Sequence, residues 1–215
     1  MTIRRSTASL LSGTALLAGA VLLLTSCSTS AAGAGGDAAP AGAALAALTP
    51  EPPDGEVWGQ GTVLDDGSSA KLCLGAVAES APPQCSGIPL LGWSWDGLTE
   101  TATTAGSTWG TFAVWGTYDG DAFTVTRTPV PLALFDAMPA PDPTQGRPGT
   151  ATPTDVDTIH AVAPEAIGDA YLGSYDQDGW VYVDVIWDDG TWQRAADQDF
   201  GADKVIVRSA LRLVE

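Results

Sequence analysis

The chain has 215 residues, with 26 acidic side chains against 9 basic ones and a net charge of −17 at pH 7. This balance excludes nucleic acid as a partner, because phosphate binding needs clustered Lys and Arg. It also keeps the body of the protein away from an anionic membrane surface and favours solubility through mutual repulsion.

The first 26 residues have the layout of a secretory signal peptide. Arg4 and Arg5 precede an apolar stretch from Leu10 to Leu24, and small residues then lead to Cys27. A membrane span is disfavoured, because the stretch is shorter than the roughly 20 residues that a bilayer needs and is interrupted by Gly and Ser. An ordinary signal peptide is the plain alternative.

The segment Leu24-Thr25-Ser26-Cys27 resembles the lipobox of bacterial lipoproteins. The resemblance implies that the chain is cleaved before Cys27 and that a lipid such as palmitate is attached to this cysteine. The lipid would hold the protein on the outer, extracytoplasmic face of the cell membrane. Without residues 1–26 the chain keeps 26 acidic and 7 basic side chains.

Residues 27–54 are predicted to be a flexible tether behind the lipidated cysteine. Ala, Gly, Ser, Thr and Pro dominate this segment, and it has too few large apolar residues to bury a core. The Ala-rich piece from Ala41 to Leu48 has some helix propensity but nothing evident in the sequence to pack on.

Residues 55–135 are predicted to form a mostly-β module, a small antiparallel β-barrel or sandwich. Hairpin residues occur at Asp65-Asp66-Gly67 and at Tyr118-Asp119-Gly120-Asp121. Pro129 and Pro131 end the last strand. The expected strands span residues 57–64, 71–78, 109–118 and 122–130.

The cysteines that remain after Cys27 are Cys73 and Cys85, both within this module. An even pair in an exported protein predicts a disulfide. A metal site is disfavoured, since the chain has two such thiols and a single histidine. A redox pair would normally have the Cys-x-x-Cys spacing.

Residues 136–154 are predicted to be a linker, because five prolines prevent any regular element there. Residues 155–215 are predicted to form a small α+β sandwich, with helices on an antiparallel sheet. Its first helix, through Val156 and Ile159, is expected to end at Pro164. Strands over 170–175 and 180–187, a helix over 191–200 that stops at Gly201, and strand-like residues 204–214 complete it. The fold class predicted for the whole chain is α+β.

Several stretches resemble uncharacterised cell-envelope lipoproteins of high-GC Gram-positive bacteria. The resemblance covers most of both modules and implies an envelope location and a shared occurrence of the two modules, but no activity. The stretches are Lys71-Leu72-Cys73-Leu74-Gly75, Pro82-Pro83-Gln84-Cys85, Gly92-Trp93-Ser94-Trp95 and Gly116-Thr117-Tyr118-Asp119-Gly120.

No catalytic or metal-binding motif stands out. His160 is the only histidine and has Asp155 and Asp157 nearby, but no serine has a matching setting and Gly-x-Ser-x-Gly is absent, so a solvent-facing helix histidine is favoured. Asp176 and Asp178 and the run Asp188-Asp189 do not have the spacing of a calcium loop, and Asp-Gly is ordinary turn chemistry. No cofactor is expected.

Eight tryptophans are the unusual feature of the composition. Trp93 and Trp95 would point the same way in an extended segment, and with Trp180 they are the candidate ligand-binding residues. The competing interpretation makes them core or loop anchors. The favoured function is a non-enzymatic module that binds an envelope protein. The alternatives are a cell-wall glycan-binding lipoprotein and a hydrolase with unidentified catalytic residues.

Overall fold

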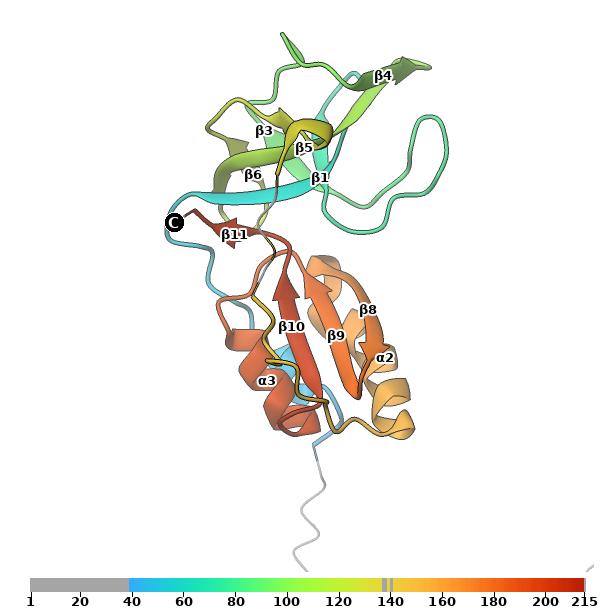
Figure 1. Cartoon of the computed structure of the whole chain (residues 1–215), viewed down its shortest axis with the longest axis vertical. Helices are drawn as coiled ribbons and strands as arrows, with labels where there is room; N and C mark the ends of the chain where they lie inside the picture. Colours follow the sequence, from blue (N-terminus) through green and yellow to red (C-terminus); the bar gives the residue numbers. More distant parts are fainter. Residues whose placement is uncertain (1–38, 137–138, 140, 215) are drawn as a thin grey trace, which may run out of the picture. The chain divides into compact units, whose positions relative to one another are not determined.

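The chain contains both helices and strands, with seven consecutive strands before its two longer helices, which confirms the predicted α+β class. The computed structural model describes residues 39–136, 139 and 141–214 (Figure 1). Cys27 and the predicted signal peptide lie outside the described residues. Within the described ranges, no helix has both the length and the apolar character needed to cross a membrane.

Five strands of the first half close into a barrel, which decides between the barrel and the sandwich. The strand order is β1-β2-β3-β6-β5, and β5 returns to pair with β1. All neighbours are antiparallel except β3 and β6, which run parallel. The barrel strands are β1 (Val57–Asp65), β2 (Ala70–Cys73), β3 (Ile88–Leu91), β5 (Ser107–Tyr118) and β6 (Phe123–Val125), and β4 (Thr101–Thr104) and β7 (Val130–Pro131) also pair with β5. A short 3₁₀ helix, η1 (Leu132–Leu134), follows β7.

Side chains at every second position of β1 and β5 point inward and fill the barrel interior. Val63 and Phe112 are fully buried, and glycines occupy neighbouring inward positions of the same two strands. A Cβ atom at Gly110 would lie 2.7 Å from Cε2 of Phe112 and 2.8 Å from the carbonyl oxygen of Glu100. A small barrel has room inside for few side chains, so glycine here makes space for the Phe112 ring.

The C-terminal part forms a second sheet in the order β10-β9-β8, with helices packed on one face (Figure 1). Its strands are β8 (Tyr171–Gln177), β9 (Trp180–Val185) and β10 (Val205–Ser209), and its helices are α2 (Pro153–Ile167) and α3 (Thr191–Phe200), with a 3₁₀ turn, η2 (Gly168–Ala170), between α2 and β8. β8 and β9 are antiparallel as expected, but β9 and β10 are parallel. The reason is that α3 connects them, and a helical crossover returns the chain in the same direction.

Helix α2 continues past Pro164 to Ile167, so the expectation that Pro164 ends the helix was wrong. A reciprocal capping box between Thr152 and Asp155 starts the helix at Pro153. Ile159 and Ile167, eight residues apart on one face, are both buried in the sheet's core. Burial of this face offsets the one backbone hydrogen bond that proline removes so close to the helix end.

The N-terminal part of the described chain differs from the expected tether. Residues Ala43–Ala47 form a short helix, α1, and Leu45 is buried in the core of the C-terminal sheet with 2 % exposure. The carboxylate of Asp199 in α3 accepts the backbone N–H groups of Ala44 and Leu45 at 3.0 and 2.9 Å. An acceptor at a helix N-terminus satisfies amides that have no partner within the helix. The segment is therefore packed on α3.

The C-terminal residues also join the barrel sheet. β11 (Arg212–Leu213) pairs with β1, whereas residues 155–215 were expected to form a separate α+β module. Ile186 and Leu211, which flank α3 and β10, are buried in the same cluster as Val57 and Phe112. The barrel core is thus built from both halves of the chain.

Candidate functional site

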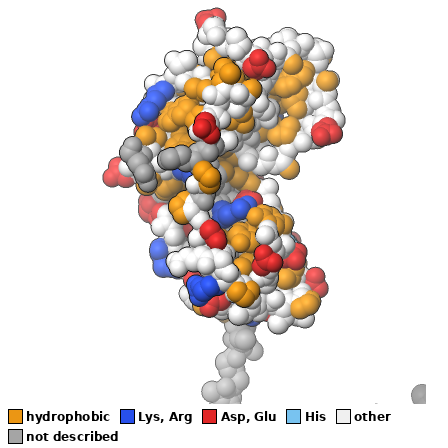
Figure 2. Space-filling view, in the orientation of Figure 1, with side chains coloured by type: hydrophobic (Ala, Val, Ile, Leu, Met, Phe, Trp, Pro, Cys, Tyr) orange, Lys and Arg blue, Asp and Glu red, His pale blue; other side chains and the backbone are white. Residues whose placement is uncertain are grey.

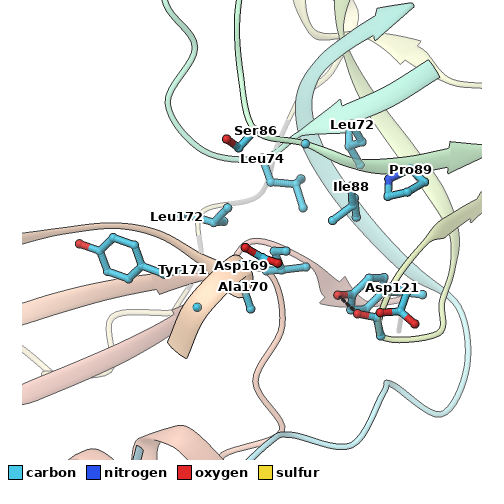
Figure 3. Close-up of a pocket in the computed structure, with 15 residues that line it drawn as sticks. Leu72, Leu74, Ser86, Ile88, Pro89, Asp121, Asp169, Ala170, Tyr171 and Leu172 are labelled. Carbon is cyan, nitrogen blue, oxygen red and sulfur yellow. Dashed lines mark hydrogen bonds between the residues drawn. The ribbon is translucent and has the colours of Figure 1, made fainter. Parts of the chain in front are cut away.

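A cavity of about 510 Å³ lies where the barrel meets η2 and the start of β8 (Figure 3). Its walls combine apolar and polar groups, and on the apolar part Leu74 from the end of β2 lies opposite Leu172 from β8. This volume is within the range of small-ligand pockets, which typically combine apolar walls with a few polar groups. The wall residues are Leu72, Leu74, Ile88, Pro89, Ala170, Leu172 and Ile186, with Ser86, Tyr118, Asp121, Asp169 and Tyr171 as its polar side chains.

Two exposed carboxylates, Asp121 and Asp169, stand at the mouth of this cavity. Asp121 lies in the turn between β5 and β6, where the carboxylate of Asp119 accepts the N–H groups of Asp121 and Ala122 at 3.0 and 2.8 Å. These bonds lower the pKa of Asp119 and fix the turn. Asp169 lies in η2, after Gly168 at φ 68°. The mouth is therefore negatively charged.

Tyr118 lines the cavity between its apolar wall and this acidic mouth. Its hydroxyl donates to the carbonyl oxygen of Gly120 at 2.6 Å. Burial raises the pKa of Tyr118, and the charges of Asp121 and Asp119 raise it further. The phenol therefore stays protonated at neutral pH and serves as a neutral hydrogen-bonding group.

Trp93 and Trp95, the first pair of candidate ligand residues, lie against the barrel core and do not line this cavity. Their rings meet edge-on with centroids 5.1 Å apart, and both pack on Phe112, at 5.3 and 6.0 Å. The indole N–H of Trp95 donates to Asp65 at 3.0 Å. The indole N–H of Trp93 is buried without a partner among the described residues. Both side chains are half-buried, so part of each ring remains accessible.

Trp180, the third candidate, lies in β9 and is only 6 % exposed. Its indole N–H donates to the carbonyl oxygen of Arg147 at 2.9 Å, in the proline-rich segment that crosses this face of the sheet. Gly149 sits against the Trp180 ring, where a Cβ atom would lie 2.8 Å from Cδ2. The structure thus places Trp180 apart from Trp93 and Trp95, with little of its ring open to a ligand.

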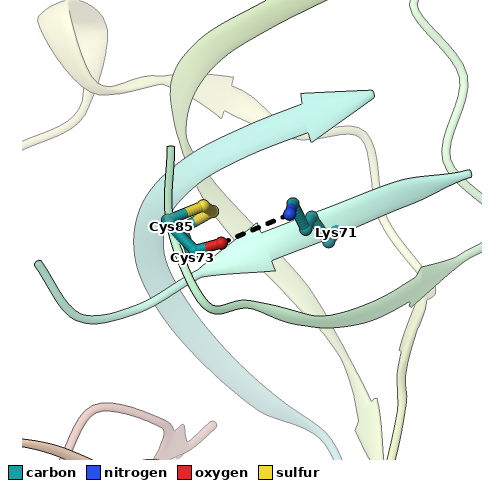
Figure 4. The surroundings of a disulfide bond; sticks show 3 residues. All are labelled: Lys71, Cys73 and Cys85. Carbon is teal, nitrogen blue, oxygen red and sulfur yellow. Dashed lines mark hydrogen bonds between the residues drawn. A yellow bond between two sulfur atoms is a disulfide. The ribbon is translucent and has the colours of Figure 1, made fainter. Parts of the chain in front are cut away.

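Cys73 and Cys85 lie at bonding distance, and their Cα atoms are 6.0 Å apart (Figure 4). This separation is the usual one for a disulfide. Lys71 Nζ donates to the carbonyl oxygen of Cys85 at 3.2 Å and ties the same loop to β2. The bridge anchors the loop that leads into β3, whose residues Ile88 and Pro89 form part of the cavity wall.

His160 has a partner that the sequence did not reveal. Its Nδ1 lies 2.6 Å from the hydroxyl of Ser174 in β8, and the hydroxyl of Tyr171 is 2.6 Å from the same oxygen. Asp176 is 3.9 Å from Nε2, too far for a hydrogen bond. No sequence motif indicates this pairing, because α2 and β8 come together only in the folded protein. Neither His160 nor Ser174 lines the cavity, so the cluster ties α2 to the edge of the sheet.

The acidic residues considered for calcium lie at the start of α3 and in a turn. Asp188 accepts the N–H groups of Trp192 and Gln193, at 2.9 and 3.2 Å, and Asp189 accepts that of Thr191 at 2.9 Å. Burial raises the pKa of Asp188 even though these amides oppose the shift. Asp178 has a positive φ of 51° in the turn between β8 and β9. In the part of the chain that the structure describes, no three His, Cys, Asp or Glu side chains gather as a metal site.

Acidic side chains are spread over the molecular face seen in Figure 2, and basic ones are few. On this face the charge therefore marks no single acidic patch, and the cavity mouth is defined by its shape as well as by Asp121 and Asp169. Comparison with known proteins adds no assignment, since no family model, curated protein or solved structure matches the chain.

Proposed function

We propose that the chain is an extracytoplasmic lipoprotein, anchored to the outer face of the cell membrane through Cys27, and that its described part is a non-enzymatic module that binds an envelope protein. The support for the anchor is the lipobox-like segment ending at Cys27. Replacing Cys27 with Ser should then abolish the lipid mass and release the protein from the membrane fraction.

The cavity between the barrel and β8 is the observation that carries the binding function. Its apolar wall and the two carboxylates at its mouth complement a short protein segment that alternates aliphatic and basic side chains. The apolar side chains of such a segment would contact Leu74, Leu172 and Ile186, and its basic groups would face Asp121 and Asp169.

Titration with two capped pentapeptides, Leu-Lys-Leu-Lys-Leu and Leu-Glu-Leu-Glu-Leu, tests this proposal on the chain from Ser28 to Glu215. This chain keeps both hydrophobic cores. We expect the basic peptide to bind and the acidic one not to bind. Changing Asp121 and Asp169 to Asn should weaken binding roughly 2- to 30-fold, since each exposed charge pair contributes about 0.2–1 kcal/mol.

Glu79→Gln with Glu165→Gln is the matched control, because it removes the same charge from exposed positions outside the cavity. Equal loss of affinity in this control would show that only net charge matters and would overturn the proposed site. Binding of a wall saccharide that depends on Trp93 and Trp95, with no peptide binding, would favour the glycan-binding alternative.

A further inference from the structure

A second hollow, which we call the arginine groove, has the opposite charge. It measures about 620 Å³ and is lined by Arg208, Arg212, Asp184, Leu74, Leu172 and Ile206. Two arginines and one aspartate line it, in a chain with 26 acidic and only 9 basic side chains. The cavity at the barrel, in contrast, is lined by two carboxylates and no Lys or Arg. The groove therefore brings two of the few basic side chains together, although the protein as a whole is strongly acidic.

Arg208 is held in a fixed orientation. Its Nε and Nη2 donate to the carboxylate of Asp184 at 2.7 and 2.8 Å. The guanidinium carbon lies 5.1 Å from the ring centres of both Tyr175 and Tyr182, and these rings stack at 5.0 Å. A guanidinium has five N–H donors. The Asp184 pair uses two, so the others remain for a ligand.

Arg212 is positioned by stacking instead of by a carboxylate. Its guanidinium carbon lies 5.3 Å from the ring centre of Trp58, which is its cross-strand neighbour in the β1–β11 pair. Among the described residues it makes no hydrogen bond or ion pair, whereas Arg127, Lys204 and Arg208 each pair with a carboxylate. Stacking on an indole orients the group without using its donors.

We propose that the arginine groove binds an organic oxyanion, a carboxylate or phosphate attached to a short apolar body. The guanidinium fork of Arg212 matches the two oxygens of such a group, and a free N–H of Arg208 supplies further contact. The apolar body lies against Leu74, Leu172 and Ile206, which belong to the uncharged part of the lining. Asp184 neutralises one arginine, so the groove has one net positive charge to complement a single anion.

Calorimetric titration of the chain from Ser28 to Glu215 tests this proposal with four hexyl compounds: hexanoate, hexyl phosphate, hexanol and hexyltrimethylammonium. We expect 1:1 binding of at least one anion and none of the alcohol or the cation. The anion that binds more tightly shows whether the groove prefers a carboxylate or a phosphate. Binding should weaken as salt rises, because the contact is electrostatic.

Arg212→Gln should weaken anion binding about 10-fold or more, the loss typical of hydrogen bonds to a charged group. Its melting temperature should change little, since the side chain has no hydrogen-bond partner among the described residues. Arg194→Gln removes an exposed arginine of α3 that lies outside the groove and is the matched control. Equal binding of hexanol, unchanged affinity in Arg212→Gln, or no binding of either anion would each overturn the proposal. None of these outcomes depends on the peptide cavity.

Discussion

Replacing Leu45 with Ala tests whether the segment before the barrel is a tether or part of the folded unit. Leu45 is 2 % exposed and packs in the core that contains Ile159 and Trp192. The substitution removes three carbon groups, each worth roughly 0.8 kcal/mol when buried. The cavity left behind adds to this loss. We therefore expect the free energy of unfolding to fall by about 3 kcal/mol.

This loss corresponds to a decrease in melting temperature of about 6–12 °C for a folded unit of this size. Urea unfolding followed by tryptophan fluorescence measures it, and Trp192 is a local reporter because its indole N–H donates to the carbonyl oxygen of Leu48 at 2.9 Å. Leu48→Ala is the matched control, since Leu48 is 45 % exposed and should change stability by less than about 0.5 kcal/mol. A Leu45→Ala variant as stable as the control would refute the packing of α1 and restore the flexible tether.

Three further predictions concern the barrel, the disulfide and acid stability. Gly116→Ala should destabilise by about 3 kcal/mol in urea unfolding, because its Cβ would collide with the backbone of Thr124, whereas Gly173→Ala, with open space, should be nearly neutral. Replacing Cys73 and Cys85 together with Ser should cost about 2–4 kcal/mol and remove the mass change on reduction; an unchanged urea midpoint would contradict the bridge. Hydrogen bonds from Lys204 and then from Thr152 lower the pKa of Asp155 from 3.8 to about 2, so their stabilisation is present above about pH 4 and is lost as pH falls toward 2. Asp155→Asn should therefore reduce the decrease in urea midpoint between pH 4 and pH 2.

Elements with strong local signals could be predicted from the sequence. Helix α3 has the predicted bounds, because an amphipathic run ends at Gly201, whose φ of 95° suits glycine. The long strand β5 was predicted over most of its length from its β-branched and aromatic residues. The α+β class followed from such segments, since each carries its own periodicity.

Features that depend on distant partners could not be predicted. Helix α1 has five residues, too few to be stable alone, and its cap Asp199 lies more than 150 positions away. Strands β3 and β4 have four residues each, too short to show alternation. In contrast, the parallel pairing of β9 and β10 was predictable from α3, since a helix between two paired strands favours a parallel arrangement, although an antiparallel sheet was expected.

The candidate site was missed for the same reason. Its wall combines residues 72–89, 118–121 and 168–186, and none of these segments carries a motif by itself. Tryptophan content directed attention to Trp93, Trp95 and Trp180 instead. The structure gives each of these rings a packing role, on Phe112 or beneath the proline-rich segment. The high tryptophan content was therefore a better guide to core packing than to a ligand site.

The two proposed sites share one wall, and this decides which substitutions can distinguish them. Leu74 and Leu172 line both the cavity and the arginine groove, and a Cβ atom at the intervening Gly75 would lie 3.3 Å from Cβ of Leu172. A change at Leu172 would disturb both hollows and separate neither proposal. The charged residues belong to one hollow each, with Asp121 and Asp169 on one side and Arg208 and Arg212 on the other. Loss of peptide binding in the aspartate variant with hexanoate binding intact, and the reverse in Arg212→Gln, would therefore show two independent sites.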